Sequence, residues 1–169
     1  FNADGRLVKS NSHWWCSCFF PGTLWYLYEA TGSDRLKTLA ETYTQRVTDQ
    51  QYTTDNHDVG FILMCSFGNG YRLTQSSSYV PILLNGAQSL STRFKPVVGL
   101  IRSWDTKTDK WQYPVIIDNM MNLELLEWAA HHSDSTKFAK IASSHAKLTM
   151  KNHFRPDFSS YHVIGYNPE

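Results

Sequence analysis

Apolar and polar positions divide the chain into pairs of helical segments, each pair combining an apolar stretch with an amphipathic one. The first apolar stretch begins near Pro21, a residue favoured in the first turn of a helix, and ends at Gly32, a typical C-terminal cap. A second helix follows the capping pair Ser33–Asp34, and its apolar residues recur at helical spacing: Leu36, Leu39, Ala40, Tyr43 and Val47. The pattern predicts an inner apolar helix beside an outer amphipathic one.

A second unit repeats this arrangement. Asp58 opens an apolar helix, which we expect Gly68–Gly70 to break, and an outer helix is predicted over about 78–93. A long connection over 95–113 follows, with β-prone residues in its first part and a polar run at 105–110.

The third unit has an apolar helix from Asp118 to Ala130 and an outer helix over about 136–152. A β-like strip at 159–164 comes after it. Units one and three align at a separation of 100 residues, which places four residues of one on identical residues of the other: Ala30, Ser33, Asp34 and Lys37 on Ala130, Ser133, Asp134 and Lys137.

The repeat, with a period of about fifty residues, predicts an all-α array of helical hairpins, either a solenoid or a closed toroid. A helix that is apolar all round is one that is buried on every side. Three hairpins would leave such helices half exposed, so closure of the array would require more chain than these 169 residues.

Composition removes several function classes. The formal net charge is +1, from 16 basic and 15 acidic residues, so we expect no nucleic-acid partner. No apolar run reaches the ~20 residues of a membrane span. The three cysteines are an odd number, which is no disulfide framework, and they lack the C-x-x-C spacing of zinc or redox sites. The histidines lack metal-ligand spacing, so we expect no metal and no cofactor. Aromatic residues make up 14 % of the chain and offer sugar-binding surfaces as well as core.

The candidate chemistry lies in two acids, Asp58 and Asp118, each at the start of an inner helix. Either one alone is explained as an N-cap, which is worth about 1 kcal/mol. Because both stand at the same end of inner helices, we also expect them to converge, and repulsion between like charges would then keep one of them protonated near neutral pH. His57 and Asn119 are their direct neighbours. A protonated acid in such a pair is suited to general acid catalysis.

Three further residues complete the candidate site. His162 lies on the β-like strip, where it is either a solvent-facing histidine or part of the site. Trp15 and Trp104 lie on predicted loops, so we regard them as better sugar platforms than Trp25 and Trp128, which fit a core.

Five stretches of the chain, in order, resemble glycoside hydrolase family 88, the unsaturated glucuronyl hydrolases. They are Phe19–Trp25, His57–Phe61, Gly68–Leu73, Asp118–Glu124 and Ser159–His162. The related unsaturated rhamnogalacturonyl hydrolases match these stretches less closely. Two positions depart from the family pattern, because Cys18 and Phe158 stand where we expect glycine.

The resemblance implies an (α/α)6 toroid of six hairpins, of which residues 1–169 would be the N-terminal half of one catalytic domain. It also implies that Asp118 is the general acid/base, with Asp58 as its carboxylate neighbour and His162 lining the site. Trp15, His57 and Trp104 would contact the uronate ring. The missing C-terminal half, in the same chain or as a separate one, is then an expected partner, and a bacterial cytoplasm or periplasm is the expected compartment.

The reaction that the resemblance implies is hydration of a vinyl ether, the C4=C5 bond that a polysaccharide lyase leaves in a terminal uronic acid of an oligosaccharide. We expect the isolated 169-residue piece to be inactive. Two alternatives remain open at this point, namely an unsaturated rhamnogalacturonyl hydrolase and a non-catalytic helical-repeat module that binds glycans or proteins.

Overall fold

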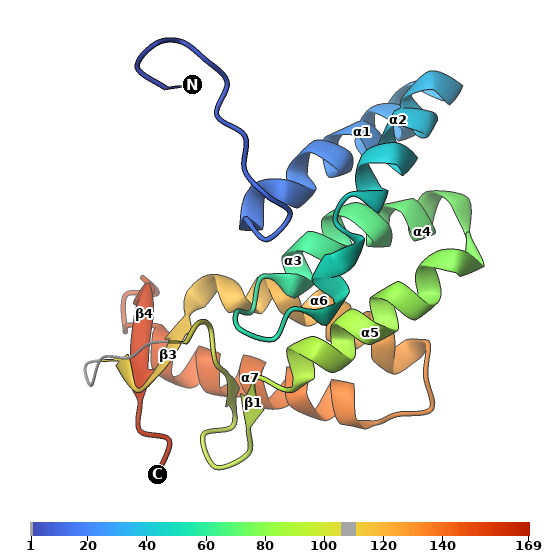
Figure 1. Ribbon diagram of the computed structural model, residues 1–169. Coiled ribbons are helices and arrows are strands. Elements are labelled where there is room, and N and C mark those ends of the chain that lie inside the picture. Colours follow the sequence, from blue (N-terminus) through green and yellow to red (C-terminus); the bar gives the residue numbers. More distant parts are fainter. Residues whose placement is uncertain (1, 106–110) are drawn as a thin grey trace.

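The computed structural model describes residues 2–105 and 111–169, and most of them lie in helices (Figure 1). Part of the polar run predicted in the long connection, 106–110, lies outside the described residues. The α-helices are α1 Phe19–Thr31, α2 Asp34–Gln45, α3 Val59–Leu63, α4 Asn69–Thr74, α5 Val80–Ser91, α6 Leu123–His131 and α7 Lys137–His153. Among the turns that connect or extend them in the described residues are the 3₁₀ turns Trp15–Cys18, Thr48–Tyr52, Ser77–Tyr79 and Ile117–Asn122, and the π turn Met64–Gly68.

The helices form three successive hairpins. Helix α1 packs against α2, α3 packs against α5, and α6 packs against α7, while α3 and α6 also contact each other. Figure 1 shows the α1–α2 hairpin at the top and α7 at the bottom, with α3, α4 and α6 between them. This is the all-α hairpin array expected from the repeat, and three hairpins are half of a six-hairpin toroid.

The core lies between inner and outer helices. Trp25 of α1 is fully buried, and its indole Nε1–H donates a hydrogen bond of 2.9 Å to Thr44 Oγ1 of α2. The prediction that Trp25 belongs to the core is therefore confirmed, whereas Trp128 of α6 is only half-buried. Helix α1 ends where the sequence indicates, because Gly32 adopts a left-handed backbone with φ 64° that glycine tolerates.

The prediction that Gly68–Gly70 breaks the second inner helix is wrong. The chain instead continues from α3 through the π turn into α4, with helical backbone throughout. The Asn69 amide, which the sequence suggested as a breaker, donates a 3.1 Å hydrogen bond to the Cys65 carbonyl one turn earlier. A π turn absorbs one extra residue without ending a helix, so the glycines lie inside a continuous rod.

The third inner helix also starts later than predicted. Asp118 lies within the 3₁₀ turn Ile117–Asn122, and α6 begins only at Leu123. Before this turn comes β3 (Tyr113–Ile116), which pairs antiparallel with β4 (Val163–Tyr166). The β-like strip predicted at 159–164 thus becomes a strand only from Val163 onward.

A second small sheet lies beside α7. Strands β1 (Phe94–Lys95) and β2 (Leu100–Ile101) pair antiparallel within the long connection, with Phe94 opposite Ile101. Among the described residues, no helix combines the length and the hydropathy needed to cross a membrane.

Candidate active site

Asp58 and Asp118 meet at the ring of His57. His57 Nε2 lies 3.2 Å from Asp58 Oδ1 and 3.7 Å from Asp118 Oδ1, so both carboxylate oxygens are within 3.7 Å of one nitrogen atom. Neither aspartate forms a side-chain cap on its helix. The capping explanation that the sequence left open for each residue therefore lacks its hydrogen bond, and the two acids instead share an imidazole.

The close approach of two helical segments creates this meeting. The backbone N–H of Phe61 in α3 donates a 2.7 Å hydrogen bond to Asn122 Oδ1, at the end of the turn that carries Asp118. At Gly60, an added Cβ would lie 2.7 Å from the Cα of Asn122, so only glycine fits there. The glycine next to Asp58 in sequence thus permits the contact that brings Asp118 close.

Burial differs across the three groups. His57 is only 5 % exposed, whereas the side chains of Asp58 and Asp118 are 26 % and 47 % exposed. The imidazole is therefore more deeply buried than the two carboxylates, which are partly accessible to solvent. An N–H donor below two carboxyl groups can orient both while leaving their outer oxygens free for a ligand.

Two loops hold His57 and Trp104 together. The His57 backbone N–H bonds to the Ser103 carbonyl at 2.9 Å, and the neighbouring residues Asn56 and Trp104 form an isolated β-bridge. Arg93, which sequence reasoning missed, is nearly buried and clamps the same loops. Its guanidinium donates to the carbonyls of Thr54 and Arg102 and to the carboxylate of Asp105, at 2.6, 2.8 and 3.0 Å.

The two predicted tryptophans contact residues that flank His57 and Asp58 in sequence. Trp15, in the first 3₁₀ turn, is 42 % exposed and packs edge-on against Phe61 of α3 at a ring-centroid distance of 6.5 Å. Trp104 is half-buried beside Asn56. Trp15 is thus held near the acids by ring packing on Phe61, and Trp104 by backbone pairing with Asn56.

His162 is exposed and lies next to the Asp118 turn through its backbone. Its carbonyl accepts a 2.9 Å hydrogen bond from the N–H of Ile117. The next residue in the chain, Val163, pairs with Ile116 where β4 joins β3. The small sheet therefore carries His162 to the segment that precedes Asp118.

The two departures from the family pattern have different structural settings. Cys18 is fully buried and its thiol contacts the Trp15 carbonyl at 3.4 Å, so it supports the turn under Trp15 rather than lining an open surface. The neighbouring Cys65 thiol, together with burial, raises the pKa of Cys18. Phe158 is 87 % exposed with φ 65°, a left-handed backbone in which glycine would be less strained.

Two buried histidines of α7 were not identified from the sequence. Nδ1 of His145 accepts a 3.0 Å hydrogen bond from the Ile101 N–H, and burial, followed by the nearby His57 and His153, lowers its pKa to about 3. Burial also lowers the pKa of His153, against the opposing effect of the Tyr161 carbonyl. The i, i+4, i+8 spacing of His145, Thr149 and His153 on a helix is the signal that could have placed them on one buried face.

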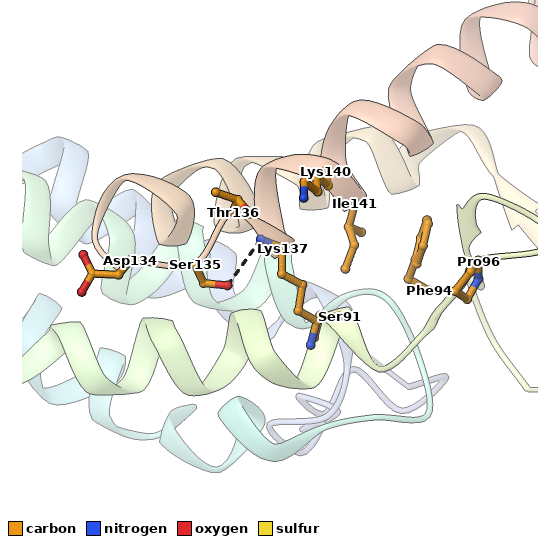
Figure 2. Close-up of a pocket in the computed structure, with 9 residues that line it drawn as sticks. All are labelled: Ser91, Phe94, Pro96, Asp134, Ser135, Thr136, Lys137, Lys140 and Ile141. Atoms are coloured by element: carbon orange, nitrogen blue, oxygen red, sulfur yellow. Dashed lines mark hydrogen bonds between the residues drawn. The ribbon is translucent and has the colours of Figure 1, made fainter.

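A pocket of about 680 Å³ lies away from these residues, at the junction of α5, β1 and the start of α7. Figure 2 shows the residues that line it: Ser91, Phe94, Pro96, Asp134, Ser135, Thr136, Lys137, Lys140 and Ile141. None of the six predicted site residues is among them. Within the described part of the chain, no group of three or more His, Cys, Asp or Glu side chains is arranged to hold a metal ion.

Comparison with known proteins connects this geometry to one family, although no protein-family model matches the chain. An unsaturated glucuronyl hydrolase of Formosa agariphila is 44 % identical over 154 residues, which are 90 % of this chain and 38 % of that protein. An unsaturated chondroitin disaccharide hydrolase of Streptococcus pyogenes serotype M1 is 30 % identical, over 98 % of this chain and 42 % of that protein.

The same relationship holds in three dimensions. A crystal structure of an unsaturated glucuronyl hydrolase specific for heparin superposes with a TM-score of 0.94 and 48 % identity, over 99 % of this chain and 44 % of that one. The chain spans about two fifths of the length of the curated relatives that it matches. By sequence and by fold, it is related to the unsaturated glucuronyl hydrolases and corresponds to one part of their longer chains.

Proposed function

We propose that the complete protein hydrolyses oligosaccharides that carry a 4,5-unsaturated uronic acid at the non-reducing end, and that residues 1–169 are the N-terminal part of its single catalytic domain. The observation that carries the proposal is the shared imidazole: His57 Nε2 lies within 3.7 Å of a carboxylate oxygen of both Asp58 and Asp118. The relationship to unsaturated glucuronyl hydrolases supports the same chemistry.

Asp118 is the proposed general acid and base. It is the more exposed carboxyl of the pair and therefore the one a sugar ring can approach. In its protonated form it gives its proton to C4 of the C4=C5 bond, which leaves positive charge shared between C5 and the ring oxygen. Water then adds to C5 and returns a proton to Asp118, and the resulting hemiketal opens and releases the next sugar. General acid–base help of this type is worth roughly 10²–10⁴-fold in rate.

Asp58 and His57 prepare that proton transfer. His57 Nε2 lies 3.2 Å from a carboxylate oxygen of Asp58 and 3.7 Å from one of Asp118, so the imidazole holds Asp58 beside the proposed acid. His57, held by the Ser103 carbonyl and almost buried, fixes the orientation of both groups. His162, Trp15 and Trp104 are proposed to contact the substrate around them.

The names of the relatives support candidate substrates, and the activities on these substrates can be measured and compared directly. The structural neighbour at 48 % identity is described as specific for heparin, and the relative from Streptococcus pyogenes is named for chondroitin disaccharides. Unsaturated disaccharides from heparin and from chondroitin, together with one from rhamnogalacturonan, therefore form the panel that separates the candidate activities.

The test is Asp118→Asn in the complete protein. We expect the loss of ultraviolet absorbance from the C4=C5 bond to slow by at least about 10²-fold, because amide nitrogen cannot deliver the proton. Asp134→Asn is the matched control, since it makes the same chemical change at an exposed aspartate that follows the C-terminal end of α6.

Unchanged melting temperatures of both variants would show that folding is retained. If Asp118→Asn kept more than about a tenth of the wild-type rate, Asp118 would not be the acid. Binding of unsaturated glycans by the wild type without turnover, and without any effect of Asp118, would favour the non-catalytic binding module instead.

A further inference from the structure

One edge of strand β2 is bonded by side chains instead of a neighbouring strand. The Ile101 N–H donates to His145 Nδ1 at 3.0 Å, and the Ile101 carbonyl accepts from Asn119 Nδ2 at 2.8 Å. Two residues further, the Ser103 carbonyl accepts the backbone N–H of His57 at 2.9 Å. The segment 101–103 therefore contacts His145 and Asn119 through their side chains and His57 through its backbone N–H.

Each of these three side chains has a second polar atom that is buried. His57 Nδ1, Asn119 Oδ1 and His145 Nε2 have no hydrogen-bond partner among the described residues. The residues are 5 %, 0 % and 0 % exposed, so solvent at the surface does not reach them. A buried polar atom left unpaired is destabilising, and three such atoms in residues that contact the segment 101–103 point to a shared partner.

The hydrogen positions of the three groups are complementary. His145 accepts at Nδ1 and is neutral, because its pKa is lowered to about 3, so its Nε2 carries hydrogen and donates. Asn119 donates through Nδ2, which leaves Oδ1 as an acceptor. His57 faces two carboxylates with Nε2, which must therefore carry hydrogen, and its Nδ1 is an acceptor when the ring is neutral.

One donor and two acceptors are what a single water molecule satisfies, since it accepts one hydrogen bond and donates two. Buried waters in proteins typically make about three such bonds to otherwise unpaired groups. His57 and His145 are also close enough that protonation of one ring opposes protonation of the other.

We propose that His145 is a positioning residue of the active site and holds the ring of His57 through a buried water that also bonds to Asn119. The water donates to His57 Nδ1 and so fixes the tautomer that carries its hydrogen on Nε2, toward Asp58 and Asp118. If the hydrogen moved to Nδ1, the Nε2 lone pair would face two carboxylates and the ring would turn away. The consequence for catalysis rests on the proposed function, whereas the bonding of the ring does not.

Two substitutions at His145 separate this role from simple packing. His145→Asn retains an acceptor near the Ile101 N–H but has no donor at the position of Nε2. His145→Gln extends an amide N–H to that position. In the complete protein, we expect the Asn variant to lose about tenfold in kcat with KM changed less than about twofold, and the Gln variant to recover most of this loss.

A spectroscopic readout requires no substrate. With ¹⁵N-labelled histidine in the complete protein, we expect His57 to be the Nε2–H tautomer in the wild type and the Gln variant, and a mixture of tautomers in the Asn variant. A His57→Gln variant assigns the signal. A crystal structure of the wild type should show a water within hydrogen-bond distance of the three buried atoms.

An unchanged His57 tautomer in the Asn variant overturns the proposal, whatever the activity. If the Asn variant does not fold, a wild-type His57 with hydrogen on Nδ1, or a wild-type crystal structure without that water, overturns it equally. A tautomer that responds to His145→Asn in a protein without hydrolase activity would support the positioning role and refute the proposed function, so the two failures are distinguishable.

Discussion

His57, His145 and His153 are almost fully buried, but the groups that contact them differ. His57 is compensated by two carboxylates, whereas His145 and His153 have only neutral partners. Burying an unpaired charge is costly, so the two histidines of α7 stay neutral in the folded protein and their pKa values are lowered. The fold thus keeps one imidazole in contact with acids and the other two among neutral groups.

This difference predicts that mild acid destabilises the complete protein. The pKa of His145 is about 3 when folded and 6.5 when unfolded, so the unfolded chain binds the extra proton below about pH 6.5. Stability is therefore fully present above that pH and falls by about 1.4 kcal/mol per unit as the pH drops toward 3, with His153 acting in the same direction. Urea unfolding at pH 7.5 and pH 5 measures the fall, and His145→Gln should make it shallower. Equal slopes for the variant and the wild type would contradict this assignment.

At the residue scale, the sequence identified the groups at the surface of the site better than those beneath it. Asp58 and Asp118 stood out because an acid beside an apolar helix is unusual. His145 did not stand out, because its importance depends on the edge of β2, a two-residue strand that no periodicity predicts. Arg93 was also missed, because its three hydrogen-bond acceptors lie on loops that only the folded chain brings to it.

At the element scale, the hairpin repeat was predictable and the junctions within helices were not. Apolar periodicity located α1, α2, α5 and α7 to within about two residues. It failed at Gly68–Gly70, where a π turn continues the helix, and at Asp118, where a 3₁₀ turn precedes α6. Both are changes of helical pitch, which the spacing of apolar residues does not resolve.

The contact between α3 and the Asp118 turn leads to a prediction for Gly60→Ala. The new Cβ would lie 2.7 Å from backbone and side-chain atoms of Asn122, so one segment must move. We expect a loss of about 1–3 kcal/mol in unfolding free energy, together with reduced kcat as Asp58 and Asp118 separate. Urea unfolding and the absorbance assay of the complete protein measure the two effects.

Gly68→Ala is the matched control for this change. Its Cβ would meet mainly the end of the Met64 side chain, which is flexible and can move aside. We therefore expect Gly68→Ala to change both quantities little. Equal effects of the two substitutions would show that general crowding, and not the α3 contact, is responsible.

At the scale of the whole molecule, the inner helices are incompletely covered. A hollow of about 510 Å³ opens between α1, α4 and α6, and its apolar lining includes Tyr26, Met121 and Trp128. Tyr26 and Met121 are each 59 % exposed. Since the matched relatives are more than twice as long as this chain, we expect the remaining hairpins of a toroid to cover this face.

Met121→Lys and Met150→Lys test that expectation as a matched pair. Both methionines are largely exposed in these 169 residues, but Met121 faces the hollow whereas Met150 lies on the outer helix α7. We expect the isolated 169-residue chain to bind an apolar dye and to aggregate, and Met121→Lys to reduce both more than Met150→Lys does. In the complete protein, the substitution that improves the isolated chain should be the harmful one. Met121→Lys should lower the melting temperature, because it buries a charge, and Met150→Lys should not. A monomeric, active 169-residue chain, or equal tolerance of the two lysines in the complete protein, would show that nothing covers the hollow.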